Sequence, residues 1–170
     1  MPTQINGLPA HVLLVHVVVM LVPVAALVLI ATAWSRPVRR WAGVGGPVLC
    51  LGALVMVPVT TNAGKWFRDH MNPDVAASAA VRKHTELGDH LLPWVVAMFV
   101  LSLAVWWLGR RLLGAEASSA QSDGSARALP AVQLVVAVLA TVVAVASIYQ
   151  TVRIGDSGAQ AVWKGSVVTK

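Results

Sequence analysis

The sequence predicts an all-α integral membrane protein: a four-helix bundle with a short surface helix between the second and third membrane helices. The composition is 57% hydrophobic and only 12% charged, with a mean hydropathy of +0.72, whereas soluble domains carry about 25% charged residues. The first long segment, residues 8–33, contains no Lys, Arg, Asp or Glu. Because about 20 apolar residues span a bilayer, this segment predicts a transmembrane helix.

Four apolar segments predict the four spans. They cover residues 9–34, 42–63, 90–108 and 130–150. Between the first two lies a short turn whose arginines sit between Trp34 and Trp41, a pattern typical of the headgroup region of a bilayer. Ala42, Gly46 and Cys50 recur at every fourth position, so the second span has a small-residue face that allows a close neighbour.

The polar segments complete a single transmembrane domain over residues 1–170. Asn72 is a candidate helix cap, and the alanine-rich segment Val75–Gly88 predicts the short surface helix. Residues 114–128, rich in Ser, Gly and Ala, predict a flexible linker. Residues 151–170 predict a polar C-terminal tail.

Charge and motifs exclude several function classes. The net charge of +6 fits loop cations that meet anionic lipid, and no basic–aromatic interleaving points to nucleic acid as a partner. The lone cysteine, Cys50, excludes zinc-ribbon, thioredoxin-like and c-type haem motifs. The chain has no GxSxG, HExxH or P-loop. We therefore expect no catalytic activity of its own.

The histidines are expected to lie at one side of the membrane. Four spans place the N-terminus, the second connection and the C-terminus together, and all the histidines fall in these regions: His11, His16, His70, His84 and His90. The arginines of the first and third connections directly abut helix ends, which favours the cytoplasm for that side. We therefore predict a multi-pass protein of the bacterial plasma membrane with both termini outside.

Two of these histidines are the leading ligand candidates. His11 and His16 are about 140° apart on a helix, so one of them faces the bundle, and His16 is the deeper. A bis-histidine haem b needs two imidazoles on facing helices. His16 and His90 satisfy this if the first and third spans are neighbours, with His11 and His84 as the other cofactor-binding candidates. On this basis His16→Ala and His90→Ala should each abolish cofactor binding.

A divalent metal ion is the alternative ligand. Its site would recruit carboxylates beside the histidines, with His16, His90, Asp89 and Glu86 as the candidate ligands. The polar connection that carries both carboxylates lies on the histidine side. His70 lies in the same connection but is expected to be solvated, so that His70→Ala should leave any bound cofactor in place.

Two terminal motifs carry a resemblance to a known family. NGLPAHVLLVH at residues 6–16 and RIGDSGAQAVW at residues 153–163, with a His- and Asp-bearing second connection, resemble the bacterial four-span membrane proteins grouped as DUF2231. The matching positions are His11, His16, Gly155, Gly158 and Trp163. The chain departs from the family pattern at Val12, often proline, and at Asp156, often histidine. Relatives resemble, or are fused to, Rieske or cytochrome-type redox modules, which implies electron transfer.

Three functions are consistent with these observations. The leading hypothesis is a redox-associated inner-membrane protein whose histidine-lined site at the outer face binds haem b or a metal ion. The alternative is a non-enzymatic accessory or stabilising subunit of a larger membrane complex, with no cofactor. A transporter is disfavoured because no acidic residue lies within any predicted span. The expected partners are the lipid bilayer and either a membrane redox complex or further copies of this chain.

Overall fold

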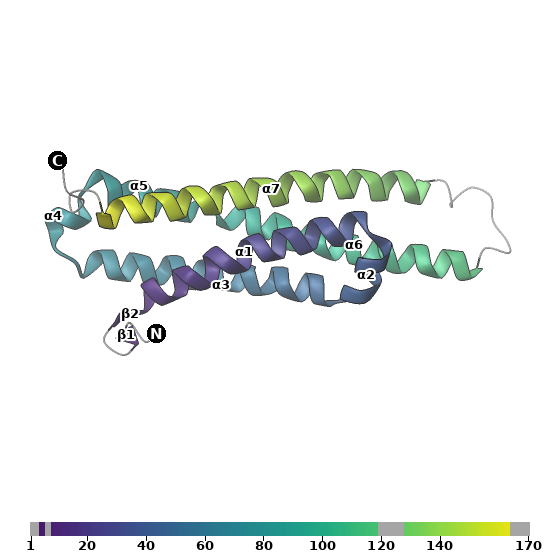
Figure 1. Cartoon of the computed structure of the whole chain (residues 1–170), viewed down its shortest axis with the longest axis horizontal. Helices are drawn as coiled ribbons and strands as arrows, with labels where there is room; N and C mark the ends of the chain where they lie inside the picture. Colours follow the sequence, from purple (N-terminus) through teal and green to yellow (C-terminus); the bar gives the residue numbers. More distant parts are fainter. Residues whose placement is uncertain (1–3, 6–7, 119–127, 164–170) are drawn as a thin grey trace.

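The helices form an elongated bundle in the computed structural model, which describes residues 4–5, 8–118 and 128–163 (Figure 1). Two short strands, β1 (Gln4–Ile5) and β2 (Leu8–Pro9), pair antiparallel before the first helix. The helices are α1 (Ala10–Trp34), α2 (Arg36–Ala42), α3 (Gly45–Asp69), α4 (Pro73–Ala76), α5 (Ala79–Asp89), α6 (Leu92–Ser118) and α7 (Ala128–Trp163). The predicted all-α bundle is confirmed, although the two-residue strands were not expected.

The packing order of the long helices fixes which side chains can meet. α1 packs mainly against α3 and α7, and α6 packs against the same two helices. α1 and α6 therefore lie diagonally across the bundle. α5 lies against α7 and α3. The beginning of α1 and the end of α7 lie at the same end of the bundle as α4 and α5, whereas α2 lies toward the opposite end (Figure 1).

The distribution of apolar side chains fits a bilayer environment. Within the described residues, the helical stretches long and apolar enough to cross a membrane are Ala10–Trp34, Gly45–Asp69, Ala79–Arg111 and Ala131–Ala161. Large apolar side chains such as Met20, Leu27 and Val142 are exposed on the outside. The interior holds many small or branched residues, including Ala25, Ala140, Ala144, Val22 and Val95. Small interior residues allow the close helix approach that drives packing in lipid.

Local signals explain the helices at the two ends of the bundle. The predicted turn after α1 is itself a helix, α2, capped by Ser35, whose side chain accepts from the Val38 N–H. α2 ends at Ala42 and is followed by its C-cap, Gly43, whose φ of +52° glycine adopts at little cost. At the other end the Asn72 cap is confirmed, because its side chain accepts from the Asp74 N–H at 2.9 Å. A second cap, Ser78, divides the expected surface helix into α4 and α5.

The last helix extends beyond its predicted end. The sequence predicts a polar tail from residue 151, but α7 continues to Trp163. Asp156 and Gln160 support this extension through a side-chain hydrogen bond of 2.8 Å, four positions apart. Similarly, α6 runs past residue 108 to Ser118. Of the predicted linker, residues 119–127 lie outside the described residues, as do residues 164–170 of the tail.

Candidate functional site

His11 lies in the first turn of α1 and points toward α3. Its Nδ1 lies 3.1 Å from the carbonyl oxygen of Thr60. The ring rests directly on Gly64, where a Cβ atom would lie only 2.8 Å from the ring Cε1. Phe67, one helical turn further along α3, stacks with the imidazole at a centroid distance of 6.4 Å. The ring is thus held half-buried between two long helices.

His84 lies on α5 and is held in the same manner by α7. Its Nδ1 lies 3.0 Å from the Ser157 hydroxyl oxygen and 3.2 Å from the Ile154 carbonyl oxygen. Ser157 itself donates to that carbonyl at 2.8 Å. The ring lies against Gly158, where a Cβ atom would come within 3.0 Å of Cε1. The side chain of His84, a cofactor-binding candidate from the sequence, is half-buried against α7.

These two histidines meet each other. Their ring centroids are 6.3 Å apart, and the ring planes are inclined by 72°. A carbonyl oxygen accepts a hydrogen bond but cannot donate one, so the contacts with Thr60 and Ile154 assign the proton to Nδ1 in both rings. Each Nε2 then carries a free lone pair. This is the tautomer in which a histidine binds a metal through Nε2 while its other nitrogen donates to a carbonyl.

The two leading candidates of the sequence are not brought together. His16 is exposed, and its Nδ1 contacts the Val12 carbonyl oxygen of its own helix at 2.6 Å. The expectation that His16 faces the bundle is therefore wrong, and His11 is the inward-facing member of the pair. His90 is exposed at the end of α5. Moreover, the first and third spans, α1 and α6, are diagonal rather than adjacent, so the condition for a His16–His90 pair is not met.

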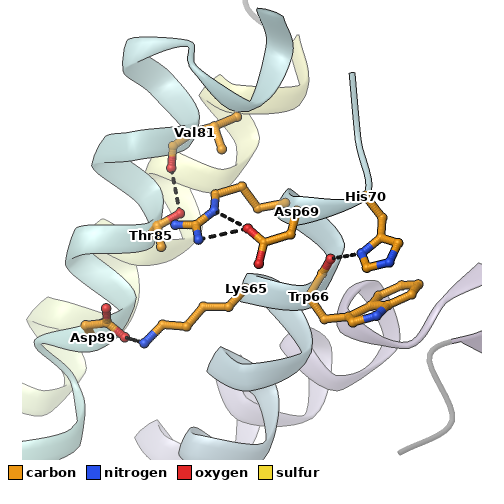
Figure 2. Close-up of polar contacts among 8 residues, drawn as sticks. Lys65, Trp66, Asp69, His70, Val81, Thr85 and Asp89 are labelled. Carbon is orange, nitrogen blue, oxygen red and sulfur yellow. Dashed lines mark hydrogen bonds and ion pairs between the residues drawn. The ribbon is translucent and has the colours of Figure 1, made fainter. Parts of the chain in front are cut away.

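The carboxylates proposed as metal ligands lie in other arrangements. Asp89 forms an ion pair with Lys65 at 2.8 Å, which joins α5 to α3 (Figure 2). Glu86 is exposed. Figure 2 also shows His70 beside Trp66, with its Nδ1 at 2.9 Å from the Trp66 carbonyl oxygen. Among the described residues, no group of three or more His, Cys, Asp or Glu side chains is placed to hold a metal ion.

The residues that support the pair were largely missed in the sequence. Thr60, Gly64 and Phe67 on α3 form the seat of His11, and Ser157 with Gly158 forms that of His84. Gly158 was noted only as part of the terminal motif. The signal that could have found the seats is a glycine inside a helix, which indicates close approach by another group.

A comparison with protein-family models places the chain in a family, whereas comparisons with curated proteins and with solved structures gave no match. The family model described as a predicted membrane protein, DUF2231, matches residues 7–170, and this range includes both histidines of the pair and both glycines on which they rest. The protein therefore belongs to the DUF2231 family of predicted membrane proteins.

Proposed function

We propose that this is a redox-associated membrane protein in which His11 and His84 together bind haem b at the outer face of the membrane. The observation that carries the proposal is the 6.3 Å separation of the two ring centroids. Two neutral imidazoles this close to each other could both serve as ligands of one haem iron, each through its Nε2.

The number of donors favours haem over a bare metal ion. The described residues offer two neighbouring imidazoles and no group of three or more acidic, histidine or cysteine ligands. A zinc site formed by protein alone takes three or four ligands. Haem iron takes only its axial ligands from the protein, because the porphyrin supplies the remaining nitrogens. A bare metal ion at this pair would need water or a second chain to complete its coordination.

The groups beside the two rings suit histidines that would hold a haem iron. The carbonyl oxygens of Thr60 and Ile154 fix the orientation of the rings and increase the electron density on each Nε2. Haem b supplies a reversible one-electron couple when bound. The protein's own part is to hold two neutral imidazoles in place at the end of an apolar bundle. An electron-transfer partner at the same face would complete the function.

A second candidate, an accessory subunit without a cofactor, is supported by the same hydrogen bonds. His11 joins α1 to α3, and His84 joins α5 to α7. Interhelical hydrogen bonds in membrane proteins contribute about 0.6–2 kcal/mol each. On this view the two histidines only stabilise the bundle, and the protein acts through a larger membrane complex or as a homo-oligomer.

The visible spectrum of the purified protein separates these functions. The protein is expressed with a tag that contains no histidine, purified in detergent, and recorded oxidised and after dithionite reduction, with metal analysis of the same sample. We expect a Soret band that shifts on reduction, with about one haem per chain. A flat spectrum with stoichiometric metal would show that the ligand is a metal ion and not haem. A flat spectrum without metal would refute the proposal and leave the accessory subunit.

Matched histidine variants test the site itself. We expect His11→Ala and His84→Ala each to lose the bound cofactor, whereas His16→Ala, on the same helix as His11, and His90→Ala retain it. This is opposite to the outcome that the sequence alone predicts for His16 and His90. If His16→Ala and His90→Ala lost the cofactor while His11→Ala and His84→Ala retained it, the proposed His11–His84 site would be wrong.

A further inference from the structure

A second cluster of polar side chains lies at the end of the bundle opposite the histidines. Arg39, on α2, is buried, with only 9% of its surface exposed. Its side chain crosses α6 at Gly109, where a Cβ atom would lie 2.6 Å from the arginine Cδ. The aliphatic part of the Arg39 side chain thus occupies a space that the absent side chain of Gly109 leaves open.

The partners of this buried guanidinium carry no charge. One terminal nitrogen donates to the Ala33 carbonyl oxygen at 3.4 Å. Both terminal nitrogens reach the side-chain oxygen of Gln133 on α7, at 2.7 and 2.6 Å, when the amide is oriented to accept. The remaining nitrogen, Nε, is buried without a hydrogen-bond partner. A buried charge of this kind is costly unless an opposite charge compensates it.

A cavity beside Arg39 concentrates positive charge. It has a volume of about 340 Å³, and four arginines line it: Arg36, Arg39, Arg40 and Arg110. None of the described lining residues is acidic. Burial, and secondarily the nearby Arg36, lower the pKa of Arg39. An anion in the cavity would relieve both effects.

The chemistry and position of the cavity identify the class of anion. Guanidinium groups bind phosphate through paired hydrogen bonds more readily than other cations do. Val44 lines the cavity and begins an exposed apolar stripe that continues along α3 through Val48, Leu51 and Val55. Trp41, 89% exposed, lines an adjoining cavity and is of the type that lies at bilayer interfaces.

We propose that this arginine cavity binds the phosphate group of an anionic phospholipid whose acyl chain lies along the apolar stripe of α3. The phosphate would meet the guanidinium groups of Arg39, Arg40 and Arg110, which line the cavity. An acyl chain can pack along the apolar stripe, so a lipid should bind more tightly than free phosphate, which has no apolar part. This site is independent of the histidine pair and does not rest on the haem proposal.

Native mass spectrometry of the detergent-purified protein tests the site. Lipids with identical chains are compared, phosphatidylglycerol against phosphatidylcholine, with inorganic phosphate as the third ligand. Because each arginine near a membrane surface contributes about 1 kcal/mol toward an anionic lipid, or about fivefold in affinity, we expect Arg39→Gln and Arg110→Gln each to weaken phosphatidylglycerol binding about fivefold. Arg110 is exposed, so its variant tests the site even if Arg39→Gln fails to fold.

The matched control is Arg111→Gln. Arg110 and its chain neighbour Arg111 each lie over a tryptophan ring, Arg110 over Trp106 at 5.3 Å and Arg111 over Trp107 at 4.6 Å. Only Arg110 and Trp106 line the cavity. We expect this variant to bind phosphatidylglycerol as the parent does. Equal binding of the two lipids, or an equal loss in the control, would overturn the proposal. If inorganic phosphate bound as tightly as phosphatidylglycerol and displaced it, the ligand would be free phosphate, and the proposal of a lipid ligand would be wrong.

Discussion

The glycines beneath the two histidines allow the site to be tested by adding a single methyl group. Gly158 and Gly155 lie three positions apart on α7, so Gly158→Ala and Gly155→Ala make the same change in nearly the same environment. In an ordinary helix interior this substitution stabilises by about 1 kcal/mol. At Gly155 nothing lies within 4 Å of the new Cβ, whereas at Gly158 the Cε1 of His84 lies at 3.0 Å.

The expected stabilities therefore differ between the two variants. The ring of His84 must move away from Gly158, which weakens its hydrogen bonds to Ser157 and Ile154, and such a bond contributes about 1 kcal/mol. Gly155→Ala should raise the free energy of unfolding by about 1 kcal/mol, and Gly158→Ala should leave it nearly unchanged. For a chain of this size, 1 kcal/mol corresponds to about 2–4 °C in melting temperature, which thermal unfolding in detergent resolves.

The same change at the other ring should have a larger effect. A Cβ at Gly64 would lie 2.8 Å from Cε1 and 2.9 Å from Nδ1 of His11, so Gly64→Ala forces the ring off the Thr60 carbonyl. We expect a lower melting temperature than in the parent, together with altered imidazole NMR signals. If Gly158→Ala and Gly64→Ala both raised the melting temperature as much as Gly155→Ala does, the rings would not occupy these seats.

Two further predictions concern the connection between α3 and α5 and the orientation of the bundle. Because Lys65 and Asp89 are each nearly half exposed, Lys65→Met or Asp89→Asn should change the free energy of unfolding by less than about 1 kcal/mol; a larger loss in thermal unfolding would contradict this. In a Cys50→Ser background, an impermeant thiol reagent on intact cells should label a cysteine that replaces Asp74 but not one that replaces Arg40. The reverse labelling would place both termini inside.

The spans were predictable because lipid imposes a simple rule on composition. A helix in a bilayer must satisfy its own backbone and present mostly apolar side chains outward, and residues 8–33 contain no Lys, Arg, Asp or Glu. Helix ends were harder to place. Residues 151–170 predict a polar tail, whereas in the structure α7 continues to Trp163, and His84 lies against Gly158 within that extension.

The histidine pair depended on information that helix periodicity does not contain. The angle between His11 and His16 correctly indicates that they cannot share a ligand, but depth along the helix was a poor guide to which one faces inward. The choice of His90 assumed that α1 and α6 are neighbours, and the packing order makes them diagonal. His84 reaches His11 because α5 folds back against α7, a tertiary arrangement that no local pattern within residues 79–89 specifies.

One structural rule connects both ends of the bundle. Three helices each provide a glycine at which a polar side chain from another helix lies against the backbone: Gly64 on α3 for His11, Gly158 on α7 for His84, and Gly109 on α6 for Arg39. In lipid a polar side chain must find hydrogen-bond partners inside the protein, and a glycine both makes room for the group and brings it close to backbone carbonyls. Because an alanine at any of these positions would displace the polar group, these glycines indicate where the bundle is built to hold its histidines and its buried arginine.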